Sequence, residues 1–292
     1  MKKIISVLLT VAMLALSVFC LGASAAETKT EALLAQLAET KSISVEFSDE
    51  AFDNDYIEVK NVKASAKVFE KADGTSDIKV AASAKAGFFN IKAYIENGEI
   101  HAYIPLLRIH INVTELMGEK VDLSQYVGEL DELMAYLESD YIACMKLKSA
   151  GEKEVDGYGN VYVEEFIPDV KAVAKKAVES GAVQLPEGVN INDLTEEELV
   201  AYVVAAGGDA ESIAAMLKTK AEFYYSNDKL VGFKAVIVDE DGNEQTVDSA
   251  QVLPFKVKSI TSGVSDKEFE QPKLCFDLTG LVKRIISMIG GI

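Results

Sequence analysis

Hydrophobic and polar residues alternate through the first half of the chain, a pattern typical of β-strands. Ile43, Val45 and Phe47 alternate with polar residues, which places them on one face of a first strand. Longer alternating segments follow, and Asp73-Gly74 and Asn97-Gly98, two typical hairpin-turn pairs, separate them. These segments cover residues 56–70, 76–96 and 99–114. The pattern predicts an antiparallel meander.

Each of the three long segments changes phase partway along. In the second segment, for example, the alternation that runs through Ala86 gives way to one that runs through Phe89. A period-2 pattern changes face when a residue is inserted, so three neighbouring phase changes indicate β-bulges or a sharp bend. Gly87 and Pro105 lie near two of the changes, and both residue types mark bends within strands. We therefore expect a strongly curved sheet.

Helical periodicity appears in four other parts of the chain, of which the last is the C-terminal segment. A short helix is expected at about 27–38, and a helical block at 126–137. A helix-rich insert is expected at about 169–219, and its second helix begins at a capping box formed by Thr195 and Glu198. Further extended segments are expected near 141–149, 159–167, 221–226, 229–239, 244–248 and 251–261.

The C-terminal segment has the most amphipathic pattern in the chain. Lys283 and Arg284 lie opposite its hydrophobic stripe. The stripe consists of Leu278, Leu281, Val282, Ile285, Ile286 and Ile289. Packing on the protein's own sheet, binding to a lipid surface or binding to a partner protein would each bury it. We expect the first, because two positive charges beside a strongly acidic protein argue against lipid.

Composition indicates a folded, acidic protein. Hydrophobic residues make up 49% of the chain, and 47 Asp and Glu residues against 29 Lys and Arg residues give a net charge of −18. Nucleic acids and anionic lipids attract Lys and Arg, so this charge opposes both, and we expect no nucleic-acid partner. Nothing resembles a linker or a repeat. The fold class expected is therefore α+β, with one domain over 26–292 that includes the helical insert.

Residues 1–25 are typical of an export signal. Lys2 and Lys3 precede an apolar run over 4–21, and small residues follow up to Ala25. We expect cleavage after Ala25 and a secreted, extracellular or cell-surface protein. An uncleaved membrane anchor is the alternative, because the apolar run approaches spanning length. No other stretch does so, and we expect no integral membrane segment after signal removal.

The three cysteines leave two questions open. Cys20 follows Phe19 rather than the small residue that a lipid-anchor site needs, so we assign it to the signal, with a lipoprotein as the alternative. Cys144 and Cys275 would remain in the mature chain. A secreted protein permits a disulfide between them, but both lie among apolar residues, where Cys also packs as a buried thiol.

No residue pattern indicates catalysis. The two histidines, His101 and His110, lie on one predicted strand out of phase with its apolar residues, so we expect them to point away from the core. Neither has a nearby nucleophile or metal-ligand spacing in the sequence. The many carboxylates include no recognisable acid pair beside an aromatic sugar platform. We expect no enzyme activity, no metal and no cofactor.

The order of these elements, with the closing segment Asp266, Phe269 and Pro272, resembles the carrier-type half-barrel superfamily. That superfamily includes periplasmic lipoprotein carriers, mycobacterial lipid-binding lipoproteins and related Gram-positive secreted proteins. The resemblance implies a curved antiparallel sheet that wraps around helices and encloses an apolar cavity. It also implies a set of ligand-binding residues on the concave face: Phe89, Ile91, Ile95, Ile104, Leu107, Ile109 and Ile111.

Two functions follow from this interpretation. The first is a secreted, non-enzymatic binding protein that holds an apolar ligand, either lipid or hydrophobic peptide, or a cell-envelope partner in a concave sheet. The second is a structural or interaction protein of the cell surface whose core is filled by its own side chains. Small alternating residues at 62–66 and 81–86 favour the second, whereas the larger residues of 88–111 are compatible with either.

Overall fold

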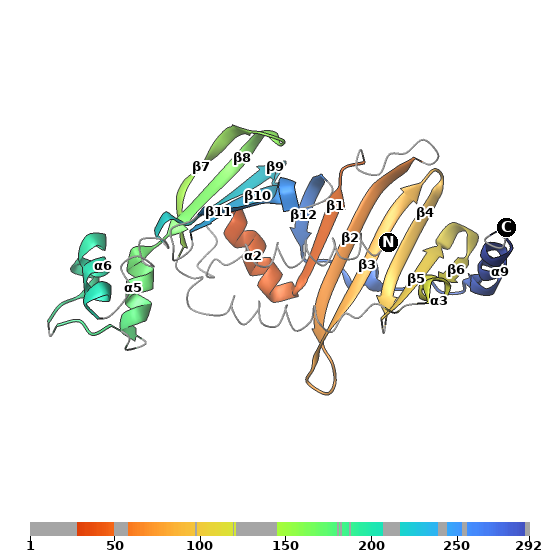
Figure 1. Cartoon of the computed structure of the whole chain (residues 1–292), viewed down its shortest axis with the longest axis horizontal. Coiled ribbons are helices and arrows are strands. Elements are labelled where there is room, and N and C mark those ends of the chain that lie inside the picture. The colour runs from red at the N-terminus through yellow and green to blue at the C-terminus, as the bar shows by residue number, and fades with distance from the viewer. Residues whose placement is uncertain are drawn as a thin grey trace. The chain divides into compact units, whose positions relative to one another are not determined.

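A computed structural model of the 292-residue chain shows a sheet-rich α+β protein, as expected (Figure 1). The structure describes residues 28–49, 58–96, 98–118, 120, 145–179, 181, 183–186, 188–206, 217–238, 244–252 and 256–289. The predicted signal, the helical block at 126–137 and Cys144 lie outside these ranges. No helix within them is long and apolar enough to span a membrane.

The chain divides into two compact units. Unit 1 contains the described residues of 36–132 and 255–292, and unit 2 contains those of 14–35 and 133–254. A single domain over 26–292 stays a prediction, and each unit is described by itself.

Unit 1 is built on a mainly antiparallel sheet with the strand order β13-β6-β5-β4-β3-β2-β1-β12. In Figure 1, β1 to β6 lie side by side in colours from orange to yellow. The strands are β1 (Ser42–Phe47), β2 (Val59–Glu70), β3 (Ser76–Ala86), β4 (Phe89–Glu96), β5 (Glu99–Ile104), β6 (Ile109–Asn112), β12 (Val257–Ser262) and β13 (Phe276–Asp277). The helices are α3 (Val113–Met117), α9 (Thr279–Ile289) and the 3-10 turns η2 (Pro105–Leu107) and η5 (Asp266–Phe269).

The structure corrects the interpretation of two phase changes. Residues 76–96 form two strands, β3 and β4, joined by a turn at Gly87, and Ala86 pairs with Phe89. Residues 99–114 likewise reverse at η2, where Ile104 pairs with Ile109. The two residues of a cross-strand pair lie on the same face of the sheet. In these two hairpins they are an odd number of positions apart in the sequence, three for Ala86 and Phe89 and five for Ile104 and Ile109. A tight hairpin therefore shifts the linear alternation by one residue, as a bulge does.

The remaining phase change is a true bulge. The register of β2 against β3 shifts between Lys60 and Lys63, and Asn61 there has a φ of 51°. One bulge and two turns replace the three bends on which the expected curvature depended. The strong curvature of the sheet therefore stays a prediction.

The antiparallel register gives the unit 1 sheet two chemically different faces. Val80 pairs with Ile95, which pairs with Ile100. These three residues are buried with Ile78 and Val113 in one core cluster, and we call this side the apolar face. The opposite side, which we call the lysine face, carries Lys60, Lys63, Lys67, Lys79, Lys85 and Lys92.

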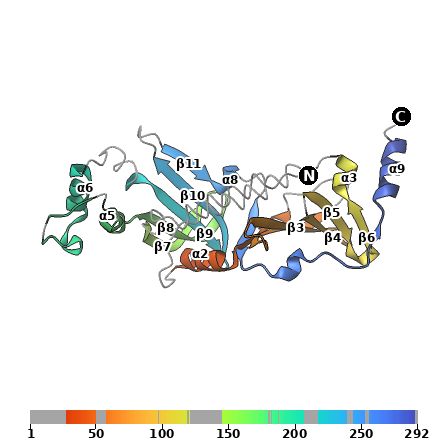
Figure 2. The same cartoon turned by 90° about the horizontal axis from the view of Figure 1, so that it is seen from below.

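The segment between β12 and α9 covers part of the lysine face. Phe269 and Cys275 pack against a buried cluster of Ala81, Tyr94 and Tyr103. Figure 2 shows this blue segment passing along one side of β3 and β4. Cys275 is a free thiol in the structure.

Helix α9 begins beside β6 and leaves most of its hydrophobic stripe exposed. Leu281, Ile285 and Ile286 are 46% to 54% exposed. The helix does contact β6 and α3, and Leu278 and Val282 are half-buried, so packing of the whole stripe on the sheet stays a prediction.

The strands of unit 2 are antiparallel and follow the order β10-β9-β8-β7, with β11 paired to β10. Its strands are β7 (Met145–Val155), β8 (Gly159–Pro168), β9 (Lys220–Ser226), β10 (Lys229–Val238) and β11 (Glu244–Asp248). Its helices after β8 are α5 (Val170–Glu179), η4 (Ile191–Asp193), α6 (Glu196–Ala205) and α8 (Ser249–Val252). The predicted strand at 251–261 is therefore a short helix followed by the shorter strand β12.

The predicted helical insert is present between β8 and β9. Helix α6 begins at the expected capping box, in which the Thr195 hydroxyl accepts a hydrogen bond from the Glu198 amide and the Glu198 carboxylate accepts one from the Thr195 amide. Val170, Ala174 and Leu199 form a small buried cluster of their own between α5 and α6.

A buried carboxylate holds the first turn of helix α2 (Lys29–Thr40) in unit 2. Glu164 of β8 is only 1% exposed. Its carboxylate accepts hydrogen bonds from the amides of Lys29 and Thr30, both at 2.9 Å, and from the Thr30 hydroxyl at 2.6 Å. The Tyr225 hydroxyl lies 2.8 Å from the same Thr30 hydroxyl. Unpaired amides at a helix N-terminus favour a negative charge, which explains how this carboxylate is tolerated in the interior.

We predict that Glu164→Ala destabilises the protein by about 3 kcal/mol, because it leaves buried helix amides without an acceptor. Urea unfolding followed by circular dichroism measures the change, and amide hydrogen exchange at Lys29 and Thr30 should accelerate. Glu152→Ala, at an exposed position on β7, is the control and should change stability by less than about 0.5 kcal/mol. Equal effects of the two substitutions would contradict the role given to Glu164.

Candidate functional site

The structure brings six of the seven predicted ligand-binding residues onto the apolar face of unit 1. Phe89, Ile91 and Ile95 alternate along β4, and Ile104, Ile109 and Ile111 lie on the same face of β5 and β6. These six residues do not share one environment. Ile95 is buried in the core cluster, where it serves packing, whereas Phe89 is exposed. The seventh residue, Leu107, lies in the η2 turn and is also exposed.

Large exposed hydrophobic side chains gather at one end of the unit 1 sheet. The β3–β4 turn supplies two of them, the η2 turn that packs on β4 supplies two more, and the segment at β13 supplies the last two. They are Phe88, Phe89, Leu106, Leu107, Leu274 and Phe276, with exposed fractions from 38% to 91%. We call this group the apolar end.

Backbone pairing joins the β13 segment to the apolar end. The Phe276 amide donates to the Arg108 carbonyl at 2.7 Å, and Phe276 pairs in parallel with Ile109. This pairing puts the Phe276 side chain on the apolar face beside Ile109 and Ile104. Leu274 and Phe276 were not predicted as site residues, because a two-residue strand has no periodic pattern. Their nearest sequence signal is their position beside Cys275, which suggested burial.

The two histidines interact with each other. Nδ1 of His101 lies 3.1 Å from Nε2 of His110, which is a hydrogen bond between one donor and one acceptor nitrogen. The outer nitrogen of His101 lies 3.8 Å from a Glu99 oxygen, and that of His110 lies 3.7 Å from an Asp277 oxygen. Both rings are on the side opposite the apolar face, as expected.

The described neighbours of this histidine pair include no nucleophile and no metal-ligand group. Within the described residues, neither ring forms a hydrogen bond with a Ser, Thr or Cys side chain that could act as a nucleophile. Tyr103 stacks on the His110 ring with centroids 4.8 Å apart. In the described ranges no group of three or more His, Cys, Asp and Glu side chains is placed to hold a metal ion.

Asp277 links this pair to the start of helix α9. The Thr279 hydroxyl and amide donate to its carboxylate, at 2.5 and 2.9 Å, and hold the pKa of Asp277 below its ordinary value of 3.8. The positive character of His110 and His101 adds to this lowering. The Thr279 hydroxyl also accepts from the Asn112 amide at 2.7 Å, so Asp277, Thr279 and β6 are joined by one small network.

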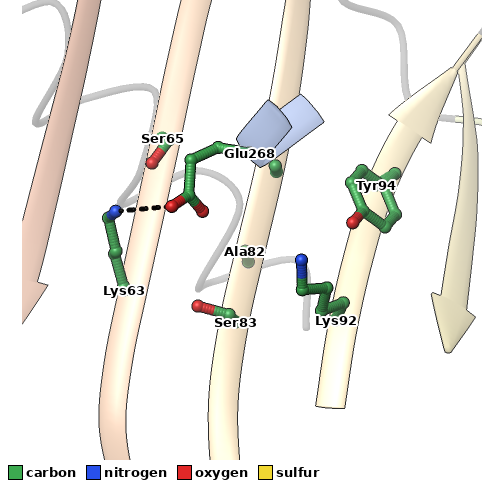
Figure 3. Close-up of a pocket in the computed structure, with 8 residues that line it drawn as sticks. Lys63, Ser65, Ala82, Ser83, Lys92, Tyr94 and Glu268 are labelled. Atoms are coloured by element: carbon green, nitrogen blue, oxygen red, sulfur yellow. Dashed lines mark ion pairs between the residues drawn. The ribbon is translucent and has the colours of Figure 1, made fainter. Parts of the chain in front are cut away.

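A polar pocket lies on the lysine face (Figure 3). Lys63, Ser83 and Lys92 form its base, in one cross-strand row over β2, β3 and β4. Glu268 reaches into the pocket from η5 and pairs with Lys63 at 3.3 Å. The other lining residues are Ser65, Ala81, Ala82 and Tyr94.

We call residues 265–270 the acidic strap, because their side chains neutralise part of the lysine face. Asp266 pairs with Lys67 at 2.7 Å, and this contact lowers the pKa of Asp266. The Tyr94 hydroxyl donates to the Glu270 carbonyl at 2.8 Å, and burial raises the pKa of Tyr94 to about 12. The sequence alone did not reveal this face, because each lysine occupies an ordinary outward position of its strand.

No protein-family model matches the chain, and no curated protein matches it. The half-barrel resemblance therefore stays a prediction, and function has to be argued from the surfaces themselves.

We predict that Asp277 titrates below 3.8 in the folded protein and that Thr279→Val raises its pKa toward that value. Because folding lowers this pKa, the carboxylate stabilises the fold above pH 3.8, and the contribution is lost as pH falls through the folded-state pKa. Carboxyl-carbon NMR measures the titration. Thr279→Ser keeps the hydroxyl and should leave the pKa low; a Ser variant that behaves like Val would show that the hydroxyl is not the cause.

Proposed function

We propose that the protein is a secreted, non-enzymatic binding protein that holds an apolar ligand, an acyl chain or a hydrophobic peptide, at the apolar end of unit 1. The observation that carries this proposal is the group of six large hydrophobic side chains exposed there. Contiguous exposed hydrophobic side chains on a folded protein mark interaction sites, because leaving them in water is unfavourable.

Removing the side chains of the apolar end from water is favourable in free energy. Burying one exposed Leu or Phe side chain contributes about 1.5 to 3 kcal/mol relative to leaving it in water. Covering two of the six would only offset the cost of immobilising a ligand, about 4 kcal/mol or more, so useful affinity requires that most of the six are covered. Ile104 and Ile109 continue the hydrophobic surface from the exposed end onto the sheet. If the sheet is also curved, as in the half-barrel interpretation, the same residues line its concave side.

The alternative function, a structural or interaction protein with a filled core, is supported by the other half of the apolar face. There Ile78, Val80, Ile95 and Ile100 pack together with Val113 and leave no room for a ligand. The two functions that the sequence left open, a filled core and a binding surface, thus each find support in a different half of the apolar face. Packing fills one half, and the exposed side chains of the other half favour binding.

We predict that Phe276→Glu and Leu107→Glu each weaken binding of a fluorescent fatty acid by tenfold or more, because each places a carboxylate at the apolar end. Both positions are exposed, so the folded state should persist, which circular dichroism checks. Leu147→Glu is the matched control, since Leu147 is an exposed leucine on β7 of unit 2. Its affinity should equal that of the wild type.

Native mass spectrometry of the purified chain, followed by lipid extraction, decides between the two functions. A co-purifying apolar ligand supports the binding protein. A clean mass without ligand, together with no uptake of fatty acid or hydrophobic peptide, would contradict it and favour the filled-core alternative.

A further inference from the structure

The lysine face of unit 1 holds a concentration of positive charge that the proposed function does not use. In a chain with a net charge of −18, six lysines share one face of three neighbouring strands. Lys67 lies directly opposite Lys79, and Lys60 lies directly opposite Lys85. Like charges placed opposite each other in a sheet are destabilising, so the arrangement needs nearby negative charge.

The acidic strap supplies that charge to one half of the face, and in the other half Glu58 pairs with Lys60 at 2.5 Å. Asp266 pairs with Lys67 at 2.7 Å, and the positive charge of Lys79 also lowers the pKa of Asp266. Phe269 of the strap packs against the buried cluster that contains Ala81 and Tyr94. The protein's own chain thus shows what this face accepts, which is a peptide that combines carboxylates with an aromatic side chain.

Apart from Lys60, the other half of the face is open. Among the described residues, Lys85 and Lys92 form no ion pair, and the Ser83 hydroxyl forms no hydrogen bond. Lys63 is held by Glu268 at 3.3 Å on the border between the two halves. Figure 3 shows Lys63, Ser83 and Lys92 around the pocket, with Glu268 entering from the strap.

We propose that this open half binds an acidic peptide segment of a partner protein. Carboxylates of the peptide pair with Lys92 and Lys85, as Asp266 and Glu268 pair with Lys67 and Lys63, and the Ser83 hydroxyl donates to one of them. Charge-assisted hydrogen bonds between ammonium and carboxylate groups are stronger than neutral ones and fix the position of the peptide. The site lies on the face opposite the apolar ligand site, so the two proposals stand independently.

The overall charge of the protein makes the test selective. A peptide of six glutamates is repelled by a chain of net charge −18 at long range, so any binding has to come from a local cationic site. We predict that fluorescein-labelled hexaglutamate binds the full chain at low salt, by fluorescence anisotropy, and that labelled hexaglutamine does not. Adding salt to about 0.5 M should abolish binding, because it screens exposed charges.

Two double substitutions, one in the proposed site and one in unit 2, test where hexaglutamate binds. Lys85→Gln with Lys92→Gln should weaken hexaglutamate binding by tenfold or more. Lys171→Gln with Lys229→Gln removes two exposed lysines of unit 2 and should change it by less than twofold. In the unsubstituted protein, backbone amide shifts caused by hexaglutamate should cluster at Ser83, Lys85 and Lys92, which tests the site without relying on any variant.

Three results would overturn the proposal. They are no binding at 1 mM hexaglutamate in low salt, equal losses in the two double variants, or amide shifts that fall outside the lysine face. Binding to phosphatidylglycerol vesicles without binding to hexaglutamate would also overturn it, since the surface would then be specific for a membrane rather than for a peptide.

Discussion

The strict alternation of side chains in an antiparallel sheet is the constraint on which unit 1 depends. Each strand must send every second residue to one side, and the register must bring the same kind of residue to the same side on its neighbours. Val80, Ile95 and Ile100 satisfy this on one side, while Lys63, Ser83 and Lys92 satisfy it on the other. A one-residue slip would put lysines into the core. The two surfaces are therefore products of a single register, and neither exists without the other.

A second constraint operates in unit 2, where Glu164 is buried. Its carboxylate accepts three hydrogen bonds from Lys29 and Thr30 at the start of α2. The carboxylate fixes the start of the helix against β8, and the helix in turn supplies the donors that make a buried charge tolerable. Glu164 is separated from Lys29 by 135 positions and from Thr30 by 134 positions in the sequence, which is why no local sequence pattern reveals these hydrogen bonds.

The sequence predicted the elements better than it predicted their connections. The strand at Ile43 to Phe47, the turn at Asp73-Gly74 and the capping box at Thr195 are confirmed, because each depends on neighbouring residues. The phase changes near Gly87 and Pro105 were misinterpreted, because a tight turn and a bulge shift a period-2 pattern in the same way. Of the candidate surface, the resemblance named Ile104 and Ile109, which pair across β5 and β6, but the exposed Phe276 and the lysine face become visible only once distant segments are paired.

The central claim is that the apolar end of unit 1 is a binding surface for an apolar ligand. The most direct measurement is methyl NMR of the isoleucine-labelled protein with a nitroxide-labelled fatty acid. We predict paramagnetic broadening of the methyl groups of Ile91, Ile104 and Ile109, with those of Ile167 and Ile191 in unit 2 unaffected. Broadening confined to unit 2, or no broadening at saturating fatty acid, would contradict it.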